Sequence, residues 1–411
     1  MTFDLILRNA AIADRPGPAV DIGIQAGRFA AIEAGLPGDG APDQDCGGRL
    51  VVPGFVETHI HLDKSCLLGR CNCEMGTLDE AIAEVVKAKK AFTEEDVYRR
   101  ASQTLEKAIK HGTNRMRTHV EVDPRVGLTS FRALKQLKAD YAWAVDLQLC
   151  VFPQEGLLDD PGCDEVMLQA LREGADVVGG APYMDKDSHG QIGRIFEMAK
   201  EFDVDIDFHL DFGLDPAHLD LDEVCRIADA TGWGGRVAIG HVTKLSAMLT
   251  AAFEAAADRL ASAGVAVTVL PATDLFLTGR DSDHNVPRGV TPAHRLRARG
   301  VNANISTNNV LNPFTPFGDC SLIRMINLYA NVAQVGATAE LSGCLDMVTS
   351  ASARLLNLAD YGIAVGNPAD LVVLDCATKA QAVCEIAQPL FGLKRGIRTF
   401  DKPAAMLHKP N

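Results

Sequence analysis

The sequence predicts an α/β protein built on a (β/α)8 barrel of the TIM type, with further β structure at both ends of the chain. In the middle of the chain, short apolar runs are followed by long amphipathic stretches, which indicates strands alternating with helices. About eight such runs occur, and eight β/α units close into a barrel. The predicted strands are 51–55, 114–120, 146–152, 175–180, 205–209, 236–241, 265–270 and 301–306.

Polar side chains at or just beyond the carboxyl ends of these runs are the second observation behind the barrel. In barrels of this type, that end of the strands carries the active site. A doubly wound open sheet is the alternative fold, but no Gly-rich phosphate loop follows the first strand. The polar residues concerned are His59, His61, His119, Gln154, His209, His241 and Asn308.

The two ends of the chain have a different pattern from the middle. Apolar and polar residues alternate around Leu5 and Leu7, and again around Ile22 and Ile24. Residues 369–375 show the same apolar character after a turn signal. This pattern is typical of short antiparallel strands, so we expect β structure at both ends.

Composition and charge favour a small-molecule partner. A net charge of −14 disfavours nucleic-acid binding, which needs a basic surface. No run approaches the ~20 apolar residues that cross a bilayer, and Asp4 lies where a secretion signal would be basic. The eleven cysteines are expected to be reduced thiols rather than a disulfide framework. We therefore expect a cytoplasmic protein that binds neither nucleic acid nor a membrane.

His59 and His61 are the most informative pair, because they end the first apolar run two residues apart. Residues two apart on a strand point to the same face, so both imidazoles would face one point. The alternative is a strand end whose histidines form hydrogen bonds with their neighbours. If His209 and His241 lie nearby, three ligands and an open position would suit a metal that activates water for hydrolysis.

Five motifs occur in order along nearly the whole chain. They are Pro-Gly-Phe-Val-Glu-Thr-His-Ile-His-Leu-Asp-Lys (53–64), Phe-Pro-Gln-Glu-Gly (152–156), Asp-Phe-His-Leu-Asp (207–211), Gly-His-Val-Thr (240–243) and Asn-Pro-Ala-Asp-Leu-Val-Val-Leu (367–374). In this combination the chain resembles the amidohydrolase superfamily. More closely, it resembles the branch of cytosine deaminase and N-isopropylammelide amidohydrolase.

The resemblance implies a domain organisation and a metal centre. Residues 1–50 and 359–411 would combine into a small β-sandwich beside a barrel of residues 51–358. One divalent metal ion would be held by His59, His61 and His209, with His241 beside the water. Zinc or iron is the expected metal, and manganese is a further candidate, because nitrogen and oxygen ligands admit all three. Assembly is frequent in this family, so a homo-oligomer is expected.

The resemblance also implies how a planar heterocycle would be held. Gln154 would recognise its polar edge, because an amide offers both a donor and an acceptor. Lys64 would either hydrogen-bond a substrate carbonyl or pair with Asp63 or another acid. Asn309 would contact the substrate. Phe212, with Phe314 and Phe317, would enclose the ring.

Two departures from the family pattern concern proton transfer. The aspartate expected at the end of the last barrel strand is Asn308, and an amide cannot act as a general base. The glutamate of cytosine deaminases three residues after the metal histidine is replaced by Phe212. Asp211 is the nearest replacement, followed by Asp63 and Asp185, and neutral His241 could also accept a proton.

The sequence therefore predicts a metal-dependent amidohydrolase that cleaves a C–N bond of a small cyclic amide, amidine or N-substituted heterocycle. Loss of one proton-transfer group costs about 10²–10⁴-fold, so efficient cytosine deamination is not expected. One alternative is hydration or lyase chemistry at the same metal site. Another is a catalytically silent homologue that only binds a ligand.

Overall fold

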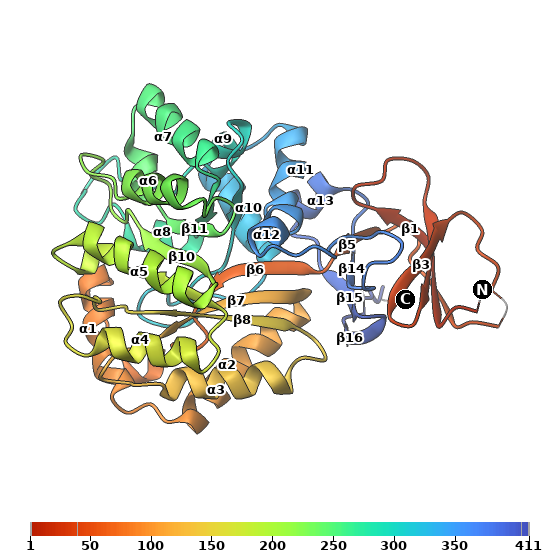
Figure 1. Cartoon of the computed structure of the whole chain (residues 1–411). Coiled ribbons are helices and arrows are strands. Elements are labelled where there is room, and N and C mark those ends of the chain that lie inside the picture. Colours follow the sequence, from red (N-terminus) through yellow and green to blue (C-terminus); the bar gives the residue numbers. More distant parts are fainter. Residues whose placement is uncertain (1, 39, 404, 410–411) are drawn as a thin grey trace.

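A computed structural model describes residues 2–38, 40–403 and 405–409 of the chain. Two bodies make up the molecule, a helix-covered barrel and a sheet formed by the two ends of the chain (Figure 1). Among the described residues, no helix is both long enough and apolar enough to cross a bilayer.

The barrel is a sheet of eight parallel strands whose spatial order follows the sequence, as predicted. Backbone hydrogen bonds close it between the first and last strands. The Asn308 amide donates to the His59 carbonyl at 2.9 Å, and the His61 amide donates to the Asn308 carbonyl at 3.1 Å. The strands are β6 (Phe55–Ile60), β7 (Thr113–Glu121), β8 (Asp146–Phe152), β9 (Val177–Gly180), β10 (Asp205–Leu210), β11 (Val237–His241), β12 (Val265–Val269) and β13 (Ala303–Ile305).

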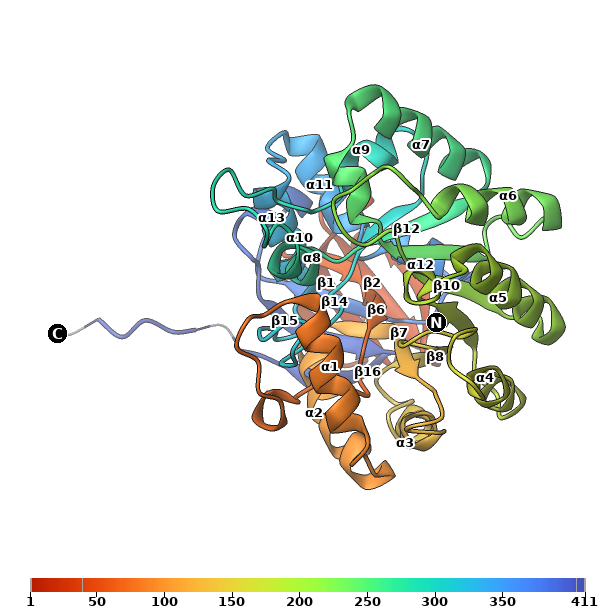
Figure 2. The ribbon, with the colours of Figure 1, turned by 90° about the vertical axis from the view of Figure 1, so that its left-hand side faces the viewer.

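Helices surround these strands (Figure 2). Their apolar faces pack on the barrel, and helix α2 shows how the sequence produces this. Its Thr93 hydroxyl caps the amide of Asp96 at 3.2 Å, while Val97, Ala101 and Leu105 are buried along one face. The helices are α1 (Leu78–Lys89), α2 (Glu94–Lys110), α3 (Thr129–Asp140), α4 (Cys163–Arg172), α5 (Ser188–Phe202), α6 (Leu221–Thr231), α7 (Thr250–Ser262), α8 (Pro271–Leu277), α9 (Ala293–Ala298), α10 (Leu322–Val332), α11 (Thr338–Asp346), α12 (Ser350–Leu355) and α13 (Lys379–Cys384).

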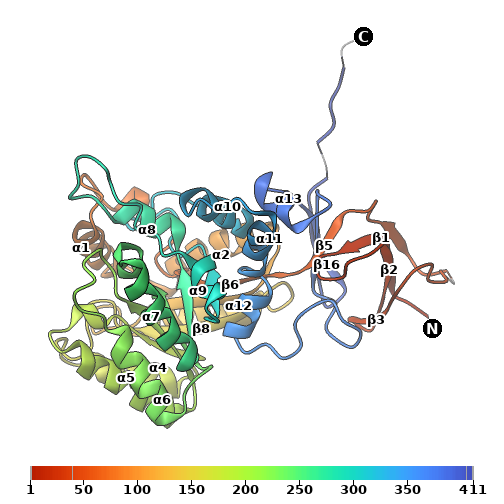
Figure 3. The ribbon, with the colours of Figure 1, turned by 90° about the horizontal axis from the view of Figure 1, so that it is seen from above.

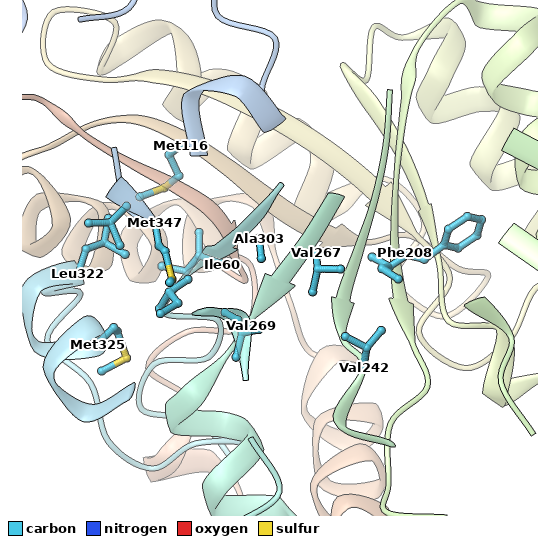
Figure 4. Packing of buried hydrophobic residues seen from close by; sticks show 14 of the residues in the cluster. Ile60, Met116, Phe208, Val242, Val267, Val269, Ala303, Leu322, Met325 and Met347 are labelled. Carbon is cyan, nitrogen blue, oxygen red and sulfur yellow. The ribbon is translucent and has the colours of Figure 1, made fainter. Parts of the chain in front are cut away.

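Apolar packing between the barrel and its helices fixes the strand ends. Figure 4 shows part of this core, where Ile60 of β6 and Val269 of β12 lie near Leu322 and Met325 of α10. These side chains are almost completely buried. Close packing of this kind resists movement, so the residues at the strand ends are held in fixed positions.

The sheet of the two chain ends lies beside the barrel (Figures 1 and 3). Its strand order is β16-β15-β14-β5-β1-β2-β3, with β4 paired to β1. Apolar side chains from both ends form its core, including Leu7, Ile22, Val51 and Leu371. The strands are β1 (Leu5–Ile12), β2 (Val20–Gln25), β3 (Arg28–Glu33), β4 (Asp43–Asp45), β5 (Leu50–Pro53), β14 (Leu371–Leu374), β15 (Pro389–Lys394) and β16 (Ile397–Asp401).

The first predicted barrel strand, 51–55, is divided between the two bodies. Strand β5 pairs with β14 in the sheet of the chain ends, and the barrel begins with β6 at Phe55. Gly54 separates them, and a Cβ at this position would lie 1.8 Å from the Asn114 amide nitrogen. A residue without a side chain is therefore required at the junction. The two bodies meet at Gly54 rather than between residues 50 and 51.

Candidate active site

Three histidines converge at the carboxyl end of the barrel. His59 and His61 come from the end of β6, and His209 comes from β10. The Nε2 atoms of His59 and His61 each lie 3.1 Å from Nε2 of His209. All three side chains are buried. We call His59, His61 and His209 the histidine cluster.

The histidine cluster fits a metal cation better than a set of hydrogen bonds. Burial, above all, lowers the pKa of each of the three imidazoles well below its usual range, which favours neutral rings. His209 Nε2 carries either one hydrogen or one lone pair, so it can form a good hydrogen bond with only one of its two neighbours. A cation among the three nitrogens removes this conflict. Tetrahedral zinc with Zn–N bonds of about 2.1 Å separates its ligands by a similar distance, about 3.4 Å.

His119, at the end of β7, lies directly against the histidine cluster. Its ring stacks on His59 with 3.7 Å between centroids, and its Nε2 lies 3.5 Å from the Asp207 carboxylate. The ring nitrogens of His59, His119 and His209 also approach closely enough to form a ligand set. The His59 and His119 rings are stacked with 26° between their planes. His119 is therefore a further candidate ligand beside the histidine cluster, and Asp207 lies next to it.

Asn308 follows β13 and lies beside the histidine cluster. It adopts a left-handed conformation, with φ of 66°, and its backbone closes the barrel against β6. Its side chain is fully buried, yet neither its amide oxygen nor its amide nitrogen has a hydrogen-bond partner. An unpaired buried amide costs free energy unless another group satisfies it. The buried amide of Asn308 is thus available to another group.

His241, at the end of β11, is paired with a carboxylate that the sequence analysis did not identify. Its Nδ1 lies 2.6 Å from Asp274 Oδ1, and Asp274 also accepts a hydrogen bond from the Leu270 amide at 3.2 Å. Asp274 is completely buried on α8, and burial raises its pKa despite the opposing effect of His241. This contact places a proton on Nδ1 and leaves Nε2 of His241 free to accept one.

The carboxylates considered as replacements for the missing acids have other partners. Asp211 accepts hydrogen bonds from the amides of Asp220 and Leu221, each at 3.0 Å, at the start of α6. Asp63 accepts from the Lys64 and Glu121 amides. Asp185 accepts from backbone amides at 157–159 and from Gln191. These contacts make structural caps, so the geometry does not favour Asp211 as the proton carrier.

Lys64 and Gln154 lie side by side on the cavity wall. The Lys64 ammonium donates to Glu121 Oε1 at 2.7 Å and to Gln154 Oε1 at 2.9 Å. It also lies 4.4 Å from the centre of the Phe314 ring. Lys64 is therefore paired with Glu121, an acid that the sequence analysis did not single out.

Glu121 also belongs to a second group of charged side chains, in which three carboxylates surround Lys89. The Lys89 ammonium donates to Glu121 at 3.0 Å and to Asp123 and Glu155, each at 2.5 Å. Glu121, Asp123 and Glu155 also have ligand atoms close enough together to hold a metal. We call these three residues the acidic cluster. Its cation is already supplied by Lys89.

A cavity with about 310 Å³ of space not filled by atoms lies over the histidine cluster. Aromatic and aliphatic side chains supply most of its wall, and the Phe212 ring packs edge-on against His241 with 5.2 Å between centroids. Phe317, by contrast, is 60% exposed and does not line the cavity. The lining residues are His61, Lys64, Leu78, Gln154, Tyr183, His209, Phe212, His241, Thr273, Leu277, Asn309 and Phe314.

Comparisons with known proteins agree with this architecture. The Amidohydrolase family matches residues 44–142 and 130–389. N-isopropylammelide isopropyl amidohydrolase of Pseudomonas sp. (strain ADP) is 29% identical over 406 residues, covering 96% of each chain. Pterin deaminase of Rhizobium rhizogenes is 28% identical over 346 residues, covering 82% of this chain and 78% of its own. The crystal structure of 5-methylcytosine deaminase from Klebsiella pneumoniae with 5-fluorocytosine superimposes with a TM-score of 0.94 at 29% identity, covering 98% of this chain and 99% of that chain.

Proposed function

The chain belongs to the amidohydrolase family, and we propose that it is a metal-dependent hydrolase that cleaves a C–N bond of a small nitrogen heterocycle. The observation that carries the proposal is that the Nε2 atoms of His59 and His61 each lie 3.1 Å from Nε2 of His209, beneath a cavity. The relatives with named substrates act on N-isopropylammelide, pterin and 5-methylcytosine, which supports a planar ring as the substrate.

His59, His61 and His209 would hold one divalent cation, with zinc or iron preferred and manganese as a further candidate. When bound, such an ion supplies the Lewis acidity that activates water at neutral pH. Asn308 pairs through its backbone with His59 and His61 and offers only an amide oxygen or amide hydrogens, so it could orient groups but cannot take their proton.

Proton transfer would fall to His241. Asp274 holds its Nδ1, so Nε2 can accept a proton from the attacking water and return it to the departing nitrogen. The dyad resembles the histidine–carboxylate pairs of other hydrolases in that the acid orients the imidazole and stabilises its cation. Asp211 is not needed in this scheme, because its carboxylate caps α6.

Phe212 and Phe314 would enclose the ring, while Lys64, Gln154 and Asn309 would contact its polar edge. We propose that cytosine itself is a poor substrate, because carboxylates are missing at positions 212 and 308. Efficient cytosine turnover would contradict this part of the proposal. Assembly of several copies and a cytoplasmic location remain predictions from the sequence.

Hydration or lyase chemistry is the second candidate, and the amide of Asn308 at the position of an expected acid is the observation that favours it. Metal analysis of the purified protein, followed by a hydrolysis screen on the same sample, tests the leading proposal. The screen would use pyrimidines, triazines, hydantoins and lactams. We expect about one metal equivalent per chain and release of ammonia or an amine from at least one ring. A protein that takes up no divalent metal would overturn the proposal.

A further inference from the structure

We infer that the recognition wall of the cavity is fixed as a hydrogen-bond donor, so that the enzyme selects rings whose facing edge carries acceptors. The inference deepens the proposed function and rests on it for the identity of the cavity as a substrate site. Two amides make up this wall, Gln154 and Asn309, and each is held in one of its two orientations by a chain of partners.

Gln154 is oriented by Lys64. An ammonium group has three donors and no acceptor, so the oxygen of the Gln154 amide must face Lys64. The NH2 group of Gln154 then turns away from Lys64. Gln154 lines the cavity, as does Tyr183, so the N–H groups of this amide are the part left for a ligand. The Gln154 amide cannot flip without placing its N–H groups against the Lys64 ammonium.

Lys64 is in turn held by a buried chain of ion pairs. Glu121 uses one carboxylate oxygen for Lys64 and the other for Lys89. Lys89, at the end of α1, is fixed by Asp123 and Glu155. Although burial opposes it, the two ammonium groups hold the pKa of Glu121 below its usual value. Lys64 and Glu121 are therefore positioning residues that set the direction of the Gln154 amide.

Asn309 is oriented by an independent chain. The amides of Phe314 and Thr315 donate to Asn312 Oδ1 at 3.0 and 3.1 Å, which fixes the Asn312 oxygen. The Asn312 NH2 group must then donate, and it does so to Asn309 Oδ1 at 2.7 Å and to the Lys64 carbonyl at 3.2 Å. The oxygen of Asn309 is thereby occupied, and its NH2 group is the part left for a ligand.

Thr273 also lines the cavity, outside the recognition wall, and differs from the two amides. Thr315 donates its hydroxyl hydrogen to the Phe314 carbonyl at 2.8 Å, so it must accept from Thr273 at 2.6 Å. Thr273 can then offer the ligand only a lone pair. It lies on α8 beside Asp274, whereas Gln154 and Asn309 follow β8 and β13.

A ring that fits this wall must present acceptors to both amides. Adjacent carbonyl oxygens, or a deprotonated imide between them, have this pattern. A ring with amino groups at the same places would set donor against donor and leave buried N–H groups unpaired. The substrate class favoured by the structure is therefore a dioxo or trioxo ring, such as an oxidised pyrimidine or triazine, rather than a diamino ring.

Cyanuric acid and melamine test this directly, because they are six-membered triazine rings of similar outline with opposite exocyclic groups. Their binding would be measured by calorimetry on zinc-loaded and on metal-stripped protein. We expect cyanuric acid to bind at least about tenfold more tightly than melamine in both forms. Equal or tighter binding of melamine would overturn the inference, as would the absence of binding of both rings at millimolar concentration.

Gln154→Glu and Asn309→Asp convert each donor into an acceptor while keeping the partner that orients it. Each change should lower the ratio of cyanuric acid to melamine affinity by at least about tenfold. Gln148→Glu is the matched control, because Gln148 lies on the same strand, accepts from Arg117 at 3.1 Å and does not line the cavity. It should leave the ratio unchanged. An unchanged ratio in both cavity variants, with melting temperatures near that of the parent, would refute the inference.

Lys64→Met tests the positioning role. Without the ammonium, the Gln154 amide can rotate by 180°. The ratio of cyanuric acid to melamine affinity should therefore fall toward that of Gln154→Glu, even though Gln154 is still present. Lys64→Arg keeps a donor and should restore the preference in part. These binding ratios are independent of turnover, so a protein that prefers cyanuric acid but hydrolyses nothing would refute the proposed function and leave this inference standing.

Discussion

The histidine cluster and the acidic cluster lie at the same end of the barrel. The acidic cluster has the spacing of a metal site, as do His59 and His209 together with His119, and His61 Nε2 lies 3.1 Å from His209 Nε2. They differ in what already fills them. The histidine cluster gathers neutral nitrogens that cannot all be satisfied by one another. The acidic cluster is filled by the Lys89 ammonium, which contacts all three carboxylates.

The difference teaches that residue types and spacing do not by themselves identify a metal site. Charge balance decides, because a buried anion must be paired and a buried neutral ligand need not be. In the acidic cluster the pairing comes from within the chain, and the cluster serves to hold α1 and Lys64. The histidine cluster consists of neutral nitrogens that can bind an added cation, which is why we propose the metal there.

The largest expected effect is the loss of the metal when a member of the histidine cluster is removed. His59→Ala, His61→Ala and His209→Ala should each reduce bound metal to a small fraction of an equivalent and hydrolysis by at least about 10³-fold. Elemental analysis after desalting measures the first, and an ammonia-release assay the second. His189→Ala, at an exposed site on α5, is the control. Full metal retention in all three variants would place the ion elsewhere.

Removing the Lys89 ammonium should make the acidic cluster able to bind an added metal ion, as we propose for the histidine cluster. Lys89→Met leaves three carboxylates without their partner, so we expect the free energy of unfolding to fall by about 3–5 kcal/mol. Added Mn²⁺ or Ca²⁺ should then raise the melting temperature of the variant but not that of the parent.

Lys87→Met is the control for this change, because Lys87 is exposed on the same helix and pairs with Glu84. Its cost should stay below about 1 kcal/mol. If Lys89→Met costs no more than Lys87→Met, the acidic cluster does not depend on its internal cation.

Asp274→Asn separates proton transfer from metal binding. The amide keeps the size of the side chain but cannot stabilise a protonated His241, so turnover should fall about a hundredfold or more. Bound metal should be unchanged, because Asp274 contacts His241 and not the histidine cluster. Asp281→Asn, in the loop after α8, serves as the control. Turnover within twofold of the parent would exclude the His241–Asp274 pair as the base.

The barrel could be predicted from the sequence because its strands are short apolar runs separated by helical patterns. Strand β8 begins and ends at the predicted residues, and the last strand could be located well enough to identify Asn308. The division of the first strand at Gly54 could not be predicted from the sequence, because the apolar run continues across this residue. Only the pairing of β5 with β14 shows that the first half of the run belongs to another sheet.

The site was predictable where side chains directly follow strands, and not where they act through a partner. His59, His61 and His209 could be predicted as neighbours because the strand ends of a barrel meet at one face. The structure does bring their nitrogens together, and their role as metal ligands stays a prediction. Asp274 lies within a helix, and only the approach of α8 to β11 brings its carboxylate to His241. Asp211 was expected to transfer a proton because it lies two residues after His209. In the structure its carboxylate accepts hydrogen bonds from amides at the start of α6.

Asn308→Asp gives the smallest expected effect and bears most directly on the comparison, because it adds one carboxylate to the histidine cluster. In the parent protein the Asn308 side chain has no hydrogen-bond partner among the described residues. A carboxylate oxygen at this position should strengthen metal retention, so we expect the variant to lose its metal to a chelator about tenfold more slowly. It also restores a group that can take a proton, so slow cytosine deamination should appear. Asn309→Asp, one residue along and bonded to Asn312, should not slow metal loss. If Asn308→Asp instead abolishes an existing activity, the amide itself takes part in the reaction, and the mechanism is distinct from one that relies on a carboxylate at this position.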